Sequence, residues 1–469
     1  METSYMISKV IFGLTIDTII KSGLVPAVLS LAVPGSLLLL WSFIDLEDPT
    51  VRITLSLIWI TILAFFSSPY WGALMRMVAN WYPYYQHGRW TLLLGFMIEV
   101  GDSLVRVMLS AVIHRYEENW RPIFRFSGAG CLMVAIPVAL SLRDKPTSRG
   151  LQMAEENPLT KLFDNSEADA HRKRLEKSVT RASAHDTDSN EHEETPPKQE
   201  ETASGMQPMS IMSHRSENVY QDLKKMKFAE IWALLKPVLA QPYFWMLAIA
   251  ACCNYAVVVL TWTYQVEYFE YITTMSHSEA TLWSGLTPLA GIPMMPLIGF
   301  WMDKVRAPHW RVVILPVSAA INALGFFALN VLDLSKDDSE PYGSVEKEYV
   351  IGASLVIALT AVTGYYLPAG VLGIELGGQK ASALVCSLID FSGAVGIVAL
   401  TLASGFLDFR WLFICGTILG AVATLDGIAI FAYKWTQAKY GEDARNMSLL
   451  PETKRSRSEP SGYDSTYIK

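Results

Sequence analysis

Residues 382–406 read SALVCSLIDFSGAVGIVALTLASGF, a run in which Asp390 is the only charged side chain. A stretch this long and this apolar is enough to cross the hydrocarbon core of a bilayer as a helix. A segment in lipid must satisfy its own backbone hydrogen bonds, which is why a helix is expected rather than a lone strand. The stretch therefore predicts an integral membrane protein with an ionisable group inside the membrane.

The rest of the chain repeats this pattern. Of its 469 residues, 51% are hydrophobic and 18% are charged, and the formal net charge is −7. This composition excludes a set of soluble domains, and no basic tract suggests a nucleic-acid binder. A short apolar piece at 5–16 is interpreted as the tail end of a helix. Ten full-length spans are predicted after it, at 23–43, 53–75, 90–113, 122–142, 240–262, 281–302, 312–332, 349–374, 382–406 and 411–433.

Between the fourth and fifth spans the chain becomes strongly charged. Residues 150–220 lack apolar periodicity and cannot bury enough surface to offset chain entropy, so we expect disorder there. A slight excess of Lys and Arg in the loops on the linker's side favours a cytoplasmic linker and C-terminus. The predicted organisation is an N-terminal bundle at 1–142, a charged and largely disordered cytoplasmic linker at 143–239, a C-terminal bundle at 240–435 and a cytoplasmic tail at 436–469.

A Gly-x-x-x-Asp pattern occurs twice, as Gly13 to Asp17 and as Gly299 to Asp303, with Lys304 following the second copy. The glycine lets two helices approach closely, and the aspartate can cap a helix or pair with a cation. We expect these five residues to control a conformational change. Four spans follow each copy, so the halves align. Two spans precede Gly299, and by symmetry the first half lacks one helix and most of a second.

Several loose motifs occur in a fixed order along the chain. They are Met6-Ile-Ser-Lys9, Asn80-Trp81-Tyr82-Pro83 with His87-Gly88, Asn119-Trp120-Arg121, Arg143-Asp144-Lys145-Pro146, Gly291-Ile292-Pro293, and Leu388-Ile389-Asp390 with Gly393-Ala394-Val395-Gly396. In this order the chain resembles the organophosphate:phosphate antiporters of the major facilitator superfamily, and the last run is similar to the sugar-phosphate exchangers. The resemblance implies an all-α membrane fold of two helical bundles around a cavity that alternates between the membrane faces.

The resemblance also implies a phosphate clamp that this sequence does not reproduce. The family holds phosphate with a basic residue in its first helix and another in its seventh. Here the region of the seventh helix, at 254–262, has no cation, and no Lys or Arg occurs between Lys236 and Lys304. Phosphate recognition needs positive charge and hydrogen-bond donors. We therefore expect any phosphate-binding cation to come from the family's first helix or from Arg106.

Three charged residues, Glu99, Asp102 and Arg106, lie in the predicted span 90–113. At about 100° per residue they fall within an arc of about 60° on one helix face. One interpretation is a cavity-facing site for a coupling proton or for a polar group of the solute. The other is a structural ion pair between Arg106 and Asp102 that fixes this helix to a neighbour.

Other polar side chains in the spans are also candidates. Asp390 is expected to face the cavity or the cytoplasmic half of its helix. Arg76 and Glu375 are expected to pair with nearby charges at the cytoplasmic ends of spans. Side chains able to hydrogen-bond a solute are Asn254, Tyr255, Tyr264, Tyr365 and Tyr366; the alternative is that these aromatics serve packing, as most aromatics in a membrane bundle do.

Three classes of function are compatible with a polytopic chain. The first is a secondary transporter of a small polar or anionic solute, with a phosphate ester and a coupling proton as alternatives. The second is a truncated or transporter-derived protein without transport activity, acting as a sensor or in an interaction. An enzyme is disfavoured because no metal-ligand pattern or activated nucleophile stands at one membrane face. The lipid bilayer is the expected partner, no cofactor or metal is expected, and we expect a monomer.

Overall fold

The structure is a computed structural model, and it describes residues 2–44, 48–116, 121–151, 235–305, 307–334, 345–407 and 409–448. Within these ranges every regular element is a helix, as predicted. The predicted disordered stretch lies outside the described residues, apart from its first two positions. It remains a prediction.

The first group of helices comes from the chain before the linker. Its elements are α1 (Glu2–Thr15), η1 (Ile16–Ile20), α2 (Leu24–Trp41), α3 (Pro49–Ser67), α4 (Tyr70–Trp81), η2 (Tyr84–Gln86), α5 (His87–Tyr116), α6 (Arg121–Ser141) and η3 (Pro146–Arg149). The apolar piece at 5–16 is confirmed as a helix. The predicted span 53–75 extends further in both directions and is interrupted at Ser68 and Pro69, between α3 and α4.

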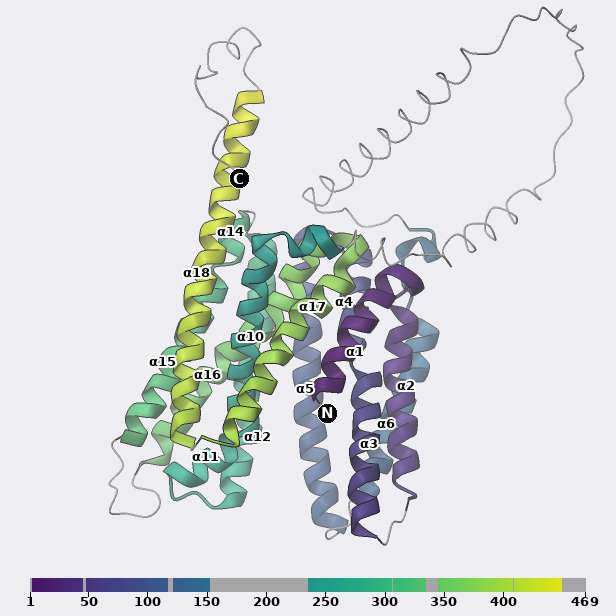
Figure 1. Cartoon of the computed structure of the whole chain (residues 1–469), viewed down its shortest axis with the longest axis vertical. Coiled ribbons are helices and arrows are strands. Elements are labelled where there is room, and N and C mark those ends of the chain that lie inside the picture. The colour runs from purple at the N-terminus through teal and green to yellow at the C-terminus, as the bar shows by residue number, and fades with distance from the viewer. Residues whose placement is uncertain are drawn as a thin grey trace, which may run out of the picture.

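The second group follows the linker. Its elements are α10 (Pro242–Thr263), α11 (Gln265–Ile272), α12 (His277–Gly291), α13 (Met294–Lys304), α14 (Pro308–Arg311), α15 (Ile314–Leu334), α16 (Lys347–Tyr366), η5 (Leu367–Leu372), α17 (Gly373–Ser404) and α18 (Phe409–Ser448). The two groups stand side by side with their long helices running in the same general direction (Figure 1).

Among the described residues, nine helical segments are long and apolar enough to cross a membrane. Helix α5 is not one of them because its sequence carries Glu99, Asp102 and Arg106, yet it runs alongside the others (Figure 1). The chain is therefore a multi-pass integral membrane protein. Helix α18 has 40 residues, about 60 Å at 1.5 Å per residue, so it is longer than a bilayer core and projects beyond the other helices (Figure 1).

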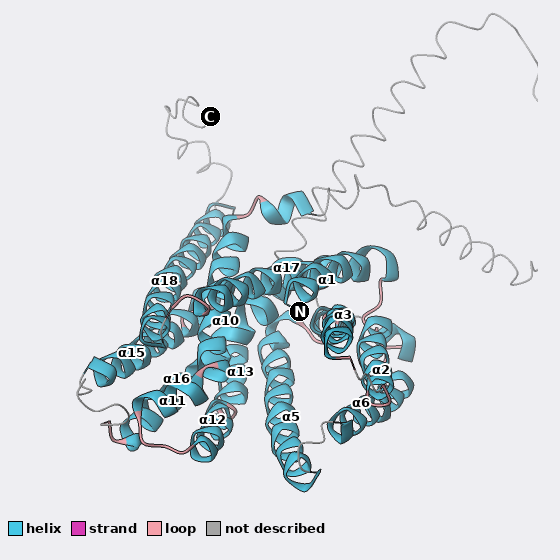
Figure 2. Ribbon diagram, turned by 60° about the horizontal axis from the view of Figure 1, so that its bottom comes forward, coloured by secondary structure: helices cyan, strands magenta, loops and turns pink. Residues whose placement is uncertain are grey.

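Corresponding helices of the two groups pack in corresponding ways. Helix α2 packs on α6, as α15 packs on α18, and α1 packs on α3, as α12 packs on α16. Between the groups, α1 lies against α17 and α5 lies against α13. Figure 2 shows α17 and α1 next to each other near the centre of the molecule. The internal repeat read from the sequence is thus visible as a repeat of helix packing.

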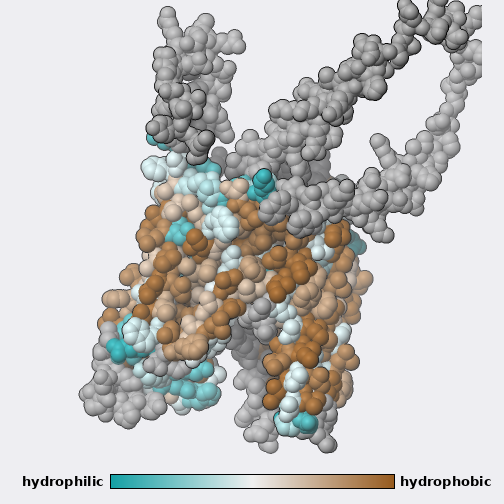
Figure 3. Space-filling model, viewed as in Figure 1, coloured by the Kyte–Doolittle hydropathy of each residue, from teal (hydrophilic) through white to brown (hydrophobic). Residues whose placement is uncertain are grey.

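The groups meet on the side toward which α18 projects. Figure 3 shows the surface hollowed between the two groups on the opposite side, so the structure is open to that side and closed on the side of the α18 extension. We call the closed side the linker side, because the chain leaves α6 and enters α10 on that side (Figure 1).

Helix α17 is kinked near its linker-side end. Gly378 has φ 59° and ψ −160°, and Ala381 has φ −128° and ψ 17°, so neither residue is helical. A positive φ at this position favours glycine, which has no Cβ to clash with the backbone. The kink places Glu375 on a short first segment of α17 and Asp390 on the long second segment.

Candidate functional site

The two Gly-x-x-x-Asp motifs lie on the linker side, and each one contacts a helix of the other group. The Asp17 carboxylate accepts a hydrogen bond from the Leu384 backbone N–H of α17 at 2.6 Å. The Asp303 carboxylate accepts one from the Arg89 backbone N–H, in the first turn of α5, at 3.2 Å. Each aspartate therefore caps the start of a helical segment across the interface, where the helix dipole favours negative charge.

A basic side chain completes each of these contacts. Arg76 of α4 forms a buried ion pair with Asp17, and the Arg89 Nε lies 3.5 Å from Asp303. The motif glycines make the approach possible, since a Cβ on Gly13 would lie 2.6 Å from the Ser387 Cβ of α17. Lys304 is exposed at the end of α13. Arg311 and Glu375 form a further ion pair within the second group, so Arg76 and Glu375 do pair with charges at this end.

Halfway along the molecule, a second set of polar side chains joins the two groups. Lys9 of α1 forms an ion pair with Asp390 of α17, and both residues are 3% exposed. The Tyr255 hydroxyl of α10 donates a hydrogen bond to the other Asp390 carboxylate oxygen at 2.5 Å. The Lys9 Nζ also lies 4.2 Å from the centre of the Tyr5 ring, within cation–π range.

Aromatic contacts extend this arrangement across the second group. The rings of Tyr255 and Tyr365 stack with their centroids 3.9 Å apart, and the ring of Tyr366 meets that of Tyr365 edge-on at 4.9 Å. The Tyr366 hydroxyl donates a hydrogen bond to the buried Glu99 carboxylate of α5 at 2.8 Å. We call Lys9, Glu99, Tyr255, Tyr365, Tyr366 and Asp390 the central cluster; it reaches from α1 through the second group to α5.

Some predicted site residues lie elsewhere. Asn254 is buried, donates to the Ala250 carbonyl at 2.7 Å and packs against Gly364, so it serves contact between α10 and α16. The Tyr264 hydroxyl lies 2.7 Å from the Ser404 hydroxyl, at the end of α10 remote from Tyr255. Helix α5 carries Asp102 and Arg106, but their side chains lie outside the described residues. Both interpretations of the charged face of α5 therefore remain predictions.

The expectation that a central cation must come from the family's first helix or from Arg106 overlooked Lys9. The structure places this lysine in the central cluster, in a helix read only as a remnant. A signal was present in the sequence, since Lys9 interrupts an apolar run, and an ionisable residue at membrane depth usually has a partner or a task.

The central cluster is suited to an anionic or hydrogen-bonding group. The Lys9 ammonium offers three N–H donors and a positive charge, and the tyrosine hydroxyls can donate or accept. In the structure the Lys9 ammonium is paired with the Asp390 carboxylate. An anion that binds Lys9 must therefore compete with that carboxylate. The cluster joins helices of both groups through the Lys9–Asp390 ion pair and the Tyr366–Glu99 hydrogen bond.

Comparison with known proteins bears on the fold. Residues 2–336 match the family model described as Major Facilitator Superfamily. Among solved structures, the chain is similar to the proton:xylose symporter XylE bound to 6-bromo-6-deoxy-D-glucose, with a TM-score of 0.58 and 13% identity over 92% of this chain and 85% of that one.

Two further solved structures are similar at the same level. The transporter FucP in the outward conformation gives a TM-score of 0.53 with 13% identity, covering 92% of this chain and 87% of that one. XylE from E. coli in a partially occluded inward open conformation gives 0.51 with 14% identity, covering 92% and 86%. At these identities the likeness shows the fold alone. No curated protein sequence matches the chain.

Proposed function

Because this chain belongs to the major facilitator superfamily, and its fold supports secondary transport by alternating access, we propose that it carries a small anionic solute of the phosphate or sugar-phosphate type. The observation that carries the proposal is the buried Lys9–Asp390 ion pair between α1 and α17. A lysine charge enclosed at the junction of two helix groups is a fixed attractor for an anion that enters from the hollow side.

The geometry supports an exchange of partners at Lys9. In the structure, Asp390 neutralises Lys9 and accepts a hydrogen bond from the Tyr255 hydroxyl. An incoming phosphate group would replace the carboxylate at the lysine, while Tyr255 keeps a hydrogen bond to Asp390. Because the ion pair joins the two groups, its replacement by a mobile anion would release one contact that holds them in the present arrangement.

Reconstitution of the full chain into liposomes tests the proposal. We expect uptake of labelled inorganic phosphate when the vesicles contain glucose 6-phosphate, and little uptake of uncharged glucose. Lys9→Gln should lower the uptake of phosphate more than tenfold. The matched control is Lys439→Gln, which removes an exposed lysine from the α18 extension and should leave uptake unchanged.

A double variant separates recognition from folding. Lys9→Gln leaves Asp390 buried without its cation, so the protein is expected to lose stability. Lys9→Gln with Asp390→Asn removes both charges, and it should regain stability without regaining phosphate uptake. Uptake of glucose alone, or phosphate uptake by the double variant at the parent rate, would refute an anionic solute. A folded parent that moves none of these solutes would favour the transporter-derived protein without transport activity.

A further inference from the structure

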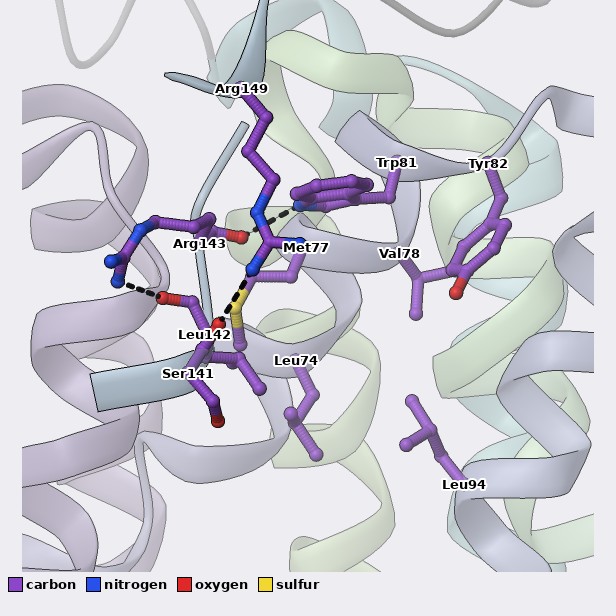
Figure 4. Close-up of a pocket in the computed structure, with 10 residues that line it drawn as sticks. All are labelled: Leu74, Met77, Val78, Trp81, Tyr82, Leu94, Ser141, Leu142, Arg143 and Arg149. Carbon is purple, nitrogen blue, oxygen red and sulfur yellow. Dashed lines mark hydrogen bonds between the residues drawn. The ribbon is translucent and has the colours of Figure 1, made fainter. Parts of the chain in front are cut away.

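A cavity lies on the linker side of the first group, apart from the central cluster. It has a volume of about 280 Å³ and lies between α4, α5 and the end of α6. Figure 4 shows it among the side chains that line it. The apolar part of its wall consists of Leu74, Met77, Val78, Leu94 and Leu142. Such a wall suits a hydrocarbon chain rather than a soluble metabolite.

Two arginines follow α6 beside this cavity. Arg143 and Arg149 follow the last residue of α6 and are exposed. Arg149 reaches over the cavity beside Trp81 (Figure 4), and its Nη2 donates to the Ser141 carbonyl at 3.2 Å. The Arg143 side chain points away from the cavity (Figure 4), and its Nη1 donates to the Leu140 carbonyl at 3.1 Å and to the Leu142 carbonyl at 2.9 Å.

These backbone contacts fix the arginines without using all of their donors. A guanidinium carries five N–H groups, and its planar fork matches the oxygens of a phosphate. The Trp81 indole donates to the Arg143 carbonyl at 2.7 Å, which ties the segment after α6 to the end of α4. Tryptophan and tyrosine side chains such as Trp81 and Tyr82 are typical of the level where lipid headgroups begin.

We propose that this cavity binds an anionic phospholipid, with part of an acyl chain against the leucine and methionine wall and the phosphate at Arg149, while Arg143 adds to the positive charge after α6. The apolar wall and the arginines beside it match the two chemically different ends of one such molecule. The site lies at the end of a span on the linker side, which we expect to be cytoplasmic, and that leaflet carries the anionic lipids.

The test uses the full chain, purified in detergent, with phosphatidylglycerol as the probe and phosphatidylcholine as the uncharged counterpart. We expect phosphatidylglycerol to raise the thermal unfolding midpoint and to remain bound in native mass spectra, with phosphatidylcholine doing neither. Arg143→Gln with Arg149→Gln should weaken phosphatidylglycerol binding roughly 30-fold. Arg125→Gln, which removes an exposed arginine near the opposite end of α6, is the matched control and should bind as the parent does.

Two further experiments separate the contribution of the acyl chain from that of the headgroup. Glycerol 3-phosphate, which has the headgroup chemistry without a chain, should not shift the unfolding midpoint through this site. Leu94→Trp, which fills the cavity and keeps both arginines, should abolish lipid binding. The proposal is overturned if the double arginine variant or Leu94→Trp binds phosphatidylglycerol as the parent does. It is also overturned if glycerol 3-phosphate reproduces the shift in the parent but not in the double arginine variant, or if a photocrosslinker at Leu94 captures a polypeptide and no lipid.

Discussion

Lys9 and Asp390 are 381 residues apart in the chain, and they form a buried ion pair that joins α1 to α17. The pair connects the two groups of helices at mid-depth, while the Gly-x-x-x-Asp motifs connect them on the linker side. Removing one partner leaves the other charge without compensation in a protein interior, which costs about 3–5 kcal/mol.

We therefore expect Asp390→Asn alone to lower the thermal unfolding midpoint in detergent strongly. Lys9→Met together with Asp390→Leu should recover most of the loss, because an apolar pair of similar volume avoids burying charge. The comparison of the single and double variants in one detergent is the measurement. Losses that simply add would mean that the two side chains do not interact.

Glu99 and Tyr366 offer a test of proton coupling. Glu99→Gln keeps the shape of the protonated acid and its acceptor for the Tyr366 hydroxyl, but it cannot release a proton. If Glu99 is the coupling group, this variant should fold and express normally and should show uptake that no longer depends on external pH. Tyr366→Phe removes only the hydrogen bond, worth about 1 kcal/mol, and should keep a pH dependence. If uptake by Glu99→Gln depends on external pH as uptake by the parent does, Glu99 has only a structural role.

The linker-side contacts predict the protection of a native cysteine. Cys386 of α17 is fully buried near Asp17. With the other four cysteines replaced by alanine, we expect Cys386 to react slowly with a thiol reagent. Arg76→Gln should raise its reaction rate at least tenfold, because Asp17 loses its cation and the contact with Leu384 loosens. Arg410→Gln disrupts an ion pair with Asp333 elsewhere in the second group and serves as the control. Equal rates in all three proteins would show that these contacts do not hold the linker side closed.

Gly393 lies where α17 meets Tyr255 of α10. A Cβ at this position would lie 2.6 Å from the Tyr255 Cγ, so Gly393→Ala must displace the ring that holds Asp390. We expect a loss of stability of about 1–3 kcal/mol and reduced uptake. The matched change is Gly352→Ala in α16, where an added Cβ meets no atom within 4 Å. It should be neutral or slightly stabilising, since alanine favours helix. Thermal unfolding and uptake of both variants decide the point.

The linker prediction concerns residues outside the described ranges and is tested by proteolysis. Protease added to sealed, right-side-out vesicles should leave 150–220 intact if this segment is cytoplasmic. After permeabilisation, cleavage within the same segment should be rapid, because a stretch that buries little surface is open to proteases. Cleavage in the sealed vesicles would show that the protein has the opposite orientation to the predicted one.

The all-helical membrane fold could be predicted because its signal is local. Long apolar runs, such as 382–406, leave the backbone no alternative to helix in lipid. The repeat of Gly13 to Asp17 in Gly299 to Asp303 also indicated how the groups align. It did not indicate that each aspartate reaches across to a helix of the other group, because that contact depends on the packing of α1 on α17 and of α5 on α13.

The central cluster was only partly accessible from the sequence. Asp390, Tyr255, Tyr365 and Glu99 were singled out as polar residues at membrane depth, but nothing local links them to one another. Lys9 was missed as a site residue since it lies in a short helix, and its partner is far away in the chain. Asn254 and Tyr264 share a helix with Tyr255, yet the rotation and depth of α10 give them other neighbours.

The kink in α17 separates two segments that each carry one ion-paired carboxylate. Gly378 and Ala381 interrupt the helix between Glu375, which pairs with Arg311, and Asp390, which pairs with Lys9. In a straight helix, a turn of one end would be transmitted rigidly to the other. A hinge at a residue with positive φ lets the long segment pivot while the short one stays anchored. A change of partner at Asp390 therefore does not require the Glu375–Arg311 ion pair to break.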